Sequence, residues 1–141
     1  MLSYGPNSPS RKSYMPTIQQ ILLDELPVPV SHYCHAVRAD DRVWISGMVG
    51  IRNDGSVPEN VEEQFQIAID CLDCALRAAG GRPEHIVKVQ VFLTDVNDRA
   101  KINPIRENYF GTHRPASTLV EVSGLISPKL KVEIEAEAVV G

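Results

Sequence analysis

The hydrophobic and polar positions alternate most regularly near the C-terminal end of the chain. Over residues 131–138, Val, Ile and Ala alternate with Lys and Glu, so a row of apolar side chains lies opposite a row of charged ones. Residues 114–122 alternate as well, with Ser117, Leu119 and Glu121 on one face. A period of two residues is typical of a β-strand with one buried face. Both segments are therefore predicted to be strands.

Helical periodicity is clearest in the middle of the chain. Asn60 followed by Glu63 is typical of a helix N-cap with its capping partner. The apolar residues that follow share one helical stripe, which consists of Phe65, Ala68, Ile69, Leu72, Ala75, Leu76 and Ala79. The glycine pair at 80–81 predicts the end of this helix. A second helix is predicted over residues 98–110, and Gly111 is its expected stop.

The remaining segments predict further strands. Residues 30–49 predict two strands joined by a polar turn at 39–41, and residues 85–93 predict a buried central strand. Gly47, inside the second of these strands, predicts a bulge or the close approach of another backbone or a ligand. The resulting order of elements indicates an α+β fold, with two helices on one face of a mixed sheet. Because both rows of several strands carry Val, Ile or Leu, the other sheet face is expected to meet another subunit.

The N-terminal region differs from the rest in composition. Residues 1–16 are rich in Pro, Ser and Asn and show no hydrophobic periodicity, which predicts an arm ordered only by packing. Residues 17–26 carry an apolar stripe at helical spacing, so a short helix or an irregular apolar strap is expected there. We therefore divide the chain into an N-terminal arm, residues 1–30, and a domain, residues 31–141.

Composition narrows the classes of partner. The chain has 141 residues, with 14 Lys and Arg against 18 Asp and Glu, and its formal net charge is -4. This balance predicts no overall attraction for nucleic acid or anionic lipid. No apolar run reaches the roughly 18 residues that a membrane span needs. Three cysteines cannot all pair within the chain and no signal-peptide core precedes them, which predicts free thiols and a cytoplasmic location.

An organelle transit peptide is the alternative for the N-terminal region. Arg11, Lys12 and several serines precede the first acidic residue, as in such peptides. Pro6, Pro9 and Pro16 oppose the amphipathic helix that a transit peptide forms, so the cytoplasmic prediction is kept.

Candidate metal and redox motifs are weak in this sequence. Cys71 and Cys74 have the spacing of a redox or metal motif, but they fall in mid-helix and no second cysteine pair completes a zinc site. His32 and His35, three residues apart in a predicted strand, are expected on opposite faces. Neither a phosphate-binding glycine loop nor a serine nucleophile elbow is present. We therefore predict neither a metal nor a cofactor.

A set of spaced motifs nevertheless resembles a known family. The motifs are Val43-Trp-Ile-Ser-Gly47, Arg77-Ala-Ala-Gly-Gly81, residues 86–95, Asn108-Tyr-Phe110, Pro115-Ala116, Val120-Glu-Val122 and Val132-Glu-Ile-Glu-Ala136. In this order they resemble the RidA family, also called YjgF-type or endoribonuclease L-PSP, over about residues 31 to 140. The resemblance implies a chorismate-mutase-like α+β fold. It also implies a homotrimer whose sheets pack into a central barrel, with clefts at the subunit interfaces.

The resemblance also implies an activity and a site. The best-known activity of the family is cofactor-free hydrolysis of reactive imines and enamines, which releases ammonia and a keto acid. Its cleft tyrosine corresponds to Tyr33, its strand serine to Ser46 and its carboxylate to Glu133. The implied hypothesis is that Glu133 holds or deprotonates a water beside the C=N carbon, while Tyr33, Ser46 and Ser117 position the substrate.

One position departs from the family pattern. In deaminating members an arginine that clamps the substrate carboxylate follows Pro-Ala, whereas Ser117 follows here, and Leu119 replaces a frequent cysteine. An arginine–carboxylate pair is worth roughly 1.5 to 3 kcal/mol, which a serine hydroxyl cannot replace. Arg114 and Arg52 are the nearest substitutes in sequence. The expected substrate therefore differs from simple 2-imino acids.

Two other functions stay open at this point. The first is a non-catalytic trimer that binds a small ligand or stabilises proteins on the same scaffold. The second is a ribonuclease, which the older family label suggests. An acidic chain without a histidine pair suited to RNA cleavage disfavours the ribonuclease.

Overall fold

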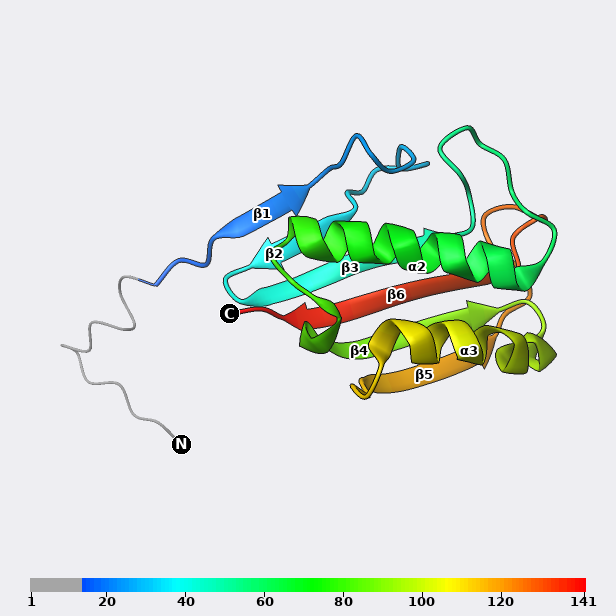
Figure 1. The fold of residues 1–141 in the computed structure, drawn as a ribbon. Coiled ribbons are helices and arrows are strands. Elements are labelled where there is room, and N and C mark those ends of the chain that lie inside the picture. The colour runs from blue at the N-terminus through cyan, green and yellow to red at the C-terminus, as the bar shows by residue number, and fades with distance from the viewer. Residues whose placement is uncertain (1–13) are drawn as a thin grey trace.

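The computed structural model describes residues 14–141, so the first 13 residues of the predicted arm, residues 1–30, lie outside the described part. Its centre is one six-stranded sheet in the order β1-β2-β3-β6-β4-β5 (Figure 1). The strands are β1 (Ile18–Ile21), β2 (Ala36–Ala39), β3 (Arg42–Val49), β4 (Ile86–Leu93), β5 (Ala116–Glu121) and β6 (Val132–Val139). Only β4 and β5 pair in parallel, so the sheet is mixed.

Two long helices cover one face of this sheet (Figure 1). They are α2 (Val61–Ala78) and α3 (Arg99–Phe110), and the short 3₁₀ turns η1 (Pro83–His85) and η2 (Val96–Asp98) flank β4. The Asn60 side chain accepts the Glu63 backbone N–H at 2.7 Å and thereby caps α2. Gly111 ends α3 at a positive φ of 61°, which glycine adopts without strain. The predicted α+β class, with both helices on one face, is confirmed.

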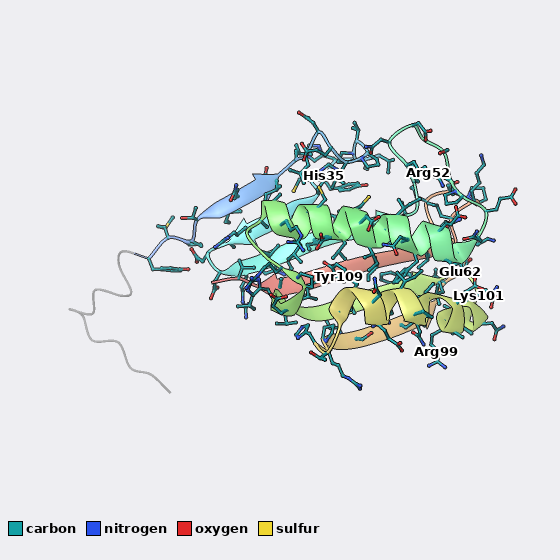
Figure 2. All side chains as sticks on the ribbon, in the orientation of Figure 1. His35, Arg52, Glu62, Arg99, Lys101 and Tyr109 are labelled. Atoms are coloured by element: carbon teal, nitrogen blue, oxygen red, sulfur yellow. The ribbon has the colours of Figure 1, made fainter. Side chains whose placement is uncertain are left out.

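The main core lies between the helices and the sheet. On β6 the apolar residues Val132, Ile134, Ala136 and Ala138 are buried, as the alternation predicted, and they join the stripe of α2. The side chains of α2 and α3 also meet directly. Tyr109, which is labelled in Figure 2, donates a hydrogen bond to Asp73 at 2.7 Å, and Asp73 pairs with Arg77 at 2.7 Å. These contacts fix both helices against the same sheet face and leave the carboxylates of β6 on the other.

A buried glutamine connects α2 to the loop that precedes β6. Gln64 is fully buried, and its side-chain amide donates to the carbonyls of Pro58 and Lys129 at 2.9 Å each. Its side-chain carbonyl accepts the Lys131 N–H at 2.8 Å. One side chain therefore satisfies three backbone groups from two loops and sets where β6 begins.

The structure corrects the prediction for residues 17–26. Neither a helix nor an irregular strap forms at residues 18–21, which instead make up β1 and pair antiparallel with β2 from Ile18 opposite Ala39 to Ile21 opposite Ala36. An isolated helix of about ten residues is marginal in water, whereas the free edge of β2 offers backbone partners. Within the described residues, this part of the predicted arm therefore belongs to the sheet of the domain.

The first strand predicted within residues 30–49 is also shorter than expected. It begins at Ala36, and residues 30–35 form bends that run over the edge of the sheet. The backbone of His35 still bonds to Ile21 of β1 and Ser46 of β3, while its buried ring is hydrogen-bonded to the backbone of Leu23 and Pro27. No helix of the described residues is both long and apolar enough to cross a membrane.

Candidate functional site

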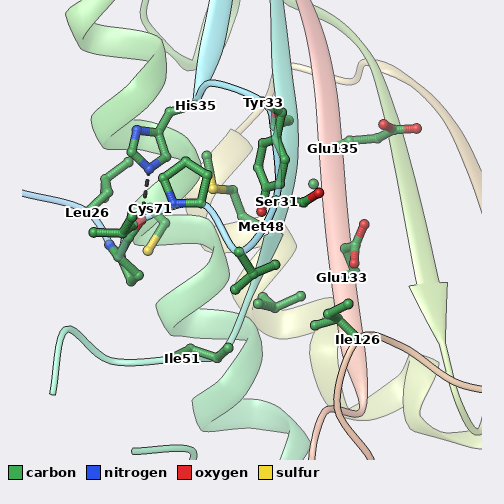
Figure 3. Close-up of a pocket in the computed structure, with 17 residues that line it drawn as sticks. Leu26, Ser31, Tyr33, His35, Met48, Ile51, Cys71, Ile126, Glu133 and Glu135 are labelled. Atoms are coloured by element: carbon green, nitrogen blue, oxygen red, sulfur yellow. Dashed lines mark hydrogen bonds between the residues drawn. The ribbon is translucent and has the colours of Figure 1, made fainter. Parts of the chain in front are cut away.

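A cavity of about 470 Å³ opens where residues 26–33, the second half of β3 and strand β6 meet (Figure 3). Its polar lining consists of Ser31, Tyr33, His35, Ser46, Glu133 and Glu135. Its apolar walls include Leu26, Val28, Val30, Met48, Ile51 and Ile126. Figure 3 shows the two glutamates projecting from β6 on the side away from helix α2. The cavity therefore joins two carboxylates to an extended apolar surface.

The Glu133 carboxylate lies against the backbone of Gly47. The register of β3 against β6 shifts between Ile45 and Met48, which confirms the bulge predicted at this glycine. A Cβ atom placed on Gly47 would overlap the Glu133 carboxylate, so only glycine permits this approach. The bulge and the glycine together determine where the carboxylate sits.

The surroundings of Glu133 in the protein favour its protonated form more strongly than bulk water does. Burial, and secondly the neighbouring carboxylate of Glu135, raise the pKa of Glu133 above its ordinary value. Among the described residues its side chain forms neither a hydrogen bond nor an ion pair. A carboxylate of raised pKa with free lone pairs is suited to accept a proton from a bound water.

Two other residues predicted from the resemblance lie around the same cavity. Ser46 donates from Oγ to the Cys34 carbonyl at 2.7 Å, and its N–H donates to the His35 carbonyl at 3.0 Å. Tyr33 lies at the mouth, with 46% of its surface exposed. The structure thus brings Tyr33, Ser46 and Glu133 together within one chain.

His35, which sequence reasoning placed on no site, anchors one wall of the cavity. Its Nδ1 lies 3.0 Å from the Leu23 N–H, and its Nε2 lies 2.9 Å from the Pro27 carbonyl. Because an N–H only donates and a carbonyl only accepts, the ring is neutral with its proton on Nε2. The ring therefore ties together the two ends of segment 23–27, of which Leu26 and Pro27 line the cavity.

The structure places Ser117 and Leu119 elsewhere in the chain. In the parallel pairing of β5 with β4, Ser117 lies beside Val89 and Leu119 beside Val91. Directly paired residues point to the same face, and both valines are buried beneath the helices. Ser117 and Leu119 therefore face the helices, while Glu133 faces the other way. Within a single chain they therefore do not lie beside Glu133, and their assignment to substrate binding in a cleft between subunits stays a prediction.

The substitute arginines proposed from sequence also lie outside the cavity. Arg114 precedes β5, which begins only at Ala116, and is exposed. Arg52 pairs with Glu63 at 3.4 Å. The Ser117 hydroxyl instead accepts a hydrogen bond from Arg106 Nη2 at 2.9 Å. One signal pointed to Arg106, because it follows Ile102 by four residues and therefore shares the buried face of α3.

The cysteine pair of α2 shows no feature of a reactive site. Cys71 lines the cavity, but burial and the nearby Asp70 carboxylate raise the pKa of its thiol to about 11. The thiol is therefore protonated at neutral pH, and only thiolates are strong nucleophiles or metal ligands. Both cysteines are free, and within residues 14–141 no group of three or more His, Cys, Asp or Glu side chains could hold a metal ion.

The mixed sheet and its carboxylate-lined cavity define a small α+β domain with a candidate site on the sheet. A model of the family described as Endoribonuclease L-PSP matches residues 24–140. The chain belongs to this family, the RidA or YjgF-type family that its motifs resemble. The 2-iminobutanoate/2-iminopropanoate deaminase of Mus musculus is 37% identical over 117 residues, which span 82% of this chain and 86% of the mouse protein.

Solved structures agree with this assignment. The YjgF gene product of E. coli aligns with a TM-score of 0.80 at 33% identity, over 86% of this chain and 98% of that chain. E. coli TdcF, whose structure contains bound serine, aligns with a TM-score of 0.82 at 30% identity, over 87% of this chain and 99% of that chain. The fold is therefore that of a family that includes 2-iminobutanoate/2-iminopropanoate deaminases.

A pH-dependent difference in stability is expected from Glu133→Gln. Folding favours the protonated form of Glu133, because its pKa is higher in the folded state than in the unfolded state. The contribution of Glu133 to the free energy of unfolding is therefore complete below the ordinary pKa of about 4. It is lost as the pH rises through the raised pKa of the folded state. At pH 7 ionised Glu133 therefore destabilises the fold, and the variant should unfold at a higher temperature than wild type. Near pH 4 the difference should disappear.

Thermal unfolding at the two pH values checks this expectation. The matched control is Glu137→Gln, which removes an exposed carboxylate from the same face of β6. A Glu133→Gln variant that unfolds below wild type at pH 7 would contradict the role assigned to burial.

Proposed function

We propose that the chain is a cofactor-free hydrolase that cleaves the C=N bond of a reactive imine or enamine and releases ammonia. The observation that carries the proposal is the Glu133 carboxylate, which is partly buried, has a raised pKa and lies against Gly47 in the cavity. Tyr33 and Ser46 line the same cavity. The deaminase names of the mammalian relatives support this assignment.

The reaction needs one base and a means of holding the nitrogen. A water bound by Glu133 adds to the C=N carbon, and the carboxylate accepts one proton of this water and passes it to the nitrogen. Glu133 then accepts the hydroxyl proton of the resulting aminoalcohol and delivers it to the nitrogen as the C–N bond breaks. Ammonia and a carbonyl compound leave, and Glu133 regains its starting state. Tyr33 and Ser46 supply hydroxyl groups that orient the substrate.

The cavity favours a substrate other than a simple 2-imino acid. Neither lysine nor arginine lines it, and its two glutamates would repel a carboxylate attached directly to the reacting carbon. Its walls are mostly apolar, which suits a hydrocarbon chain. We therefore expect imines with long apolar side chains to react faster than 2-iminopropanoate.

Ammonia release from a graded series of imines tests this proposal. The series runs from 2-iminopropanoate to imines with six-carbon side chains, and it includes an uncharged enamine of equal length. Rates above the buffer rate that increase with chain length support the proposal. Equal rates along the series would contradict the substrate preference, and buffer rates throughout would contradict the activity.

A homotrimer is part of the proposed function. The sheet face opposite the helices carries partly exposed apolar residues, among them Trp44 at 40% and Val120 at 41%. A second copy of this chain would cover them, as the family resemblance implies. Light scattering should then give about 47 kDa, three times the 15.6 kDa of one chain, and a mass of one chain would contradict the assembly.

The alternative is a trimer that binds a small ligand without turning it over. The bound serine in E. coli TdcF shows that a relative holds a small molecule, which favours keeping this second function in view. Ligand binding combined with buffer rates on every imine would assign the cavity to this alternative.

A glycine replacement tests how the carboxylate is positioned. In Gly47→Ala the added methyl group overlaps the Glu133 carboxylate, which must rotate or shift. A displacement of about 1 Å in a catalytic group can lower the rate roughly 100-fold, so a loss of this size in kcat/KM is expected. Gly55→Ala is unsuitable as a control because Gly55 has a positive φ of 87°. Gly124→Ala, where the added Cβ meets no atom, is the control.

A further inference from the structure

Arg106 occupies an unusual place for an arginine. It lies on the buried face of α3 between Ile102, which is fully buried, and Phe110, which is 9% exposed. Its side chain reaches β5, where Nη2 donates to the Ser117 hydroxyl at 2.9 Å. The four ion pairs formed by the described residues involve Arg52, Arg77, Arg82 and Lys101, so Arg106 has no carboxylate partner among them.

A partly buried cation without a counter-ion is costly. Burial lowers the pKa of the Arg106 guanidinium, yet an arginine stays charged at neutral pH. A guanidinium carries five N–H donors, and the contact with Ser117 uses one of them. The remaining donors form a planar fork that matches the two oxygens of a carboxylate. An incoming anion would satisfy both the charge and the donors.

The surroundings favour a carboxylate over a phosphate. Ser117 is a neutral hydroxyl, and the chain as a whole carries a net charge of -4. The contact between Arg106 and Ser117 places a single guanidinium at the site. Phosphate sites commonly also contain backbone N–H groups at the N-terminus of a helix. Arg106 lies in the second half of α3, away from its N-terminus. A single arginine fork suits a monoanion.

The position of the pair in the sheet gives it access to a ligand. Strand β5 is the last strand in the sheet order, so one of its edges is unpaired within the chain. Ser117 is exposed at this edge, and Arg106 beside it is only partly buried, so solvent can reach both residues. In a closed ring of identical chains, a head-to-tail contact brings one surface of a chain against a different surface of the next. The edge of β5 can thus meet a neighbour's cavity.

We propose that Arg106, with Ser117 as its hydroxyl partner, is a carboxylate-binding site that supplies the cation the Glu133 cavity lacks. The proposal rests on the proposed function in one respect, since the carboxylate would belong to the imine substrate. It places the substrate's anionic group on helix α3. It leaves the apolar cavity for the rest of the molecule and Glu133 for the C=N bond.

Calorimetric titration tests the site without any turnover. The probes are straight-chain monocarboxylates of four to eight carbons and the uncharged amides of the same lengths. Wild type is expected to bind the carboxylates at least tenfold more tightly than the matching amides. In Arg106→Leu the preference should vanish, because a charge-assisted pair worth roughly 10- to 150-fold in affinity is lost. Arg106→Lys should retain part of it.

The controls separate binding from folding. Leucine fits the apolar face between Ile102 and Phe110, so Arg106→Leu should unfold at the same or a higher temperature than wild type. Arg99→Leu removes an exposed arginine at the start of the same helix and should leave the carboxylate preference unchanged (Figure 2). An unchanged preference in Arg106→Leu would overturn the proposal, as would tighter binding of inorganic phosphate than of every carboxylate.

The outcome for this site is independent of the outcome for catalysis. If the carboxylate preference depends on Arg106 while ammonia release stays at the buffer rate, the site stands and the hydrolase assignment fails. If the chain hydrolyses imines while wild type binds carboxylates and amides equally, the hydrolase stands and this site fails.

Discussion

Replacing Glu133 with glutamine is expected to lower kcat/KM for imine hydrolysis by roughly 100-fold or more, the usual contribution of a general base. Glutamine keeps the size of the side chain and its place against Gly47, but it cannot accept a proton from water. The loss should appear in kcat as well as in kcat/KM, because the missing interaction forms only in the transition state. Ammonia release under single-turnover and steady-state conditions measures both.

The control for this experiment lies on the same strand. Glu137→Gln removes the same charge from the same face of β6, but Glu137 does not line the cavity. Its kcat/KM should stay close to that of wild type. A Glu133→Gln variant within threefold of wild type would exclude this carboxylate as the base and would turn attention to Glu135, which lines the same cavity.

Replacing Gln64 with leucine is expected to lower the free energy of unfolding by about 3 kcal/mol or more. Leucine fills a similar volume but leaves the Pro58 and Lys129 carbonyls and the Lys131 N–H without their partner. Each buried polar group left unsatisfied costs about 1–3 kcal/mol, and water reaching the Lys129 side reduces the sum. Urea unfolding at fixed protein concentration measures the change.

A charged variant sharpens this test. In Gln64→Glu the carboxylate still accepts the Lys131 N–H but faces the two carbonyl oxygens, so it should be at least as destabilising as leucine at pH 7. Gln66→Leu is the control, because Gln66 is exposed on the same helix and its side chain donates a hydrogen bond to the Asp70 carboxylate. If both Gln64 variants lay within 1 kcal/mol of wild type, the glutamine would not anchor the loop before β6.

The local elements of this fold were predictable because their signals are local. The period of two on β6 and the period of 3.6 on α2 each predict which side chains are buried in the core. Asn60 marks where α2 begins. The prediction for residues 17–26 was wrong for the opposite reason. Whether its few apolar residues form a helix or an edge strand depends on the free edge of β2, which no local pattern reveals.

The site was less predictable than the fold. Alternation showed correctly that Ser117 and Leu119 share a face, but the register with Val89 and Val91 decides which face it is. Tyr33, Ser46 and Glu133 came from the family resemblance, and the lining of their cavity by Leu26 and Pro27 was not foreseen, because residues 17–26 were expected to form a helix or a strap. These relations join residues far apart in the sequence.

The most direct test of the account is the rate of ammonia release by purified wild-type protein from an imine with a six-carbon side chain. The account predicts a rate well above buffer that falls to the buffer rate in Glu133→Gln. A wild-type rate equal to buffer on this and every shorter imine, by a correctly folded protein, would contradict it.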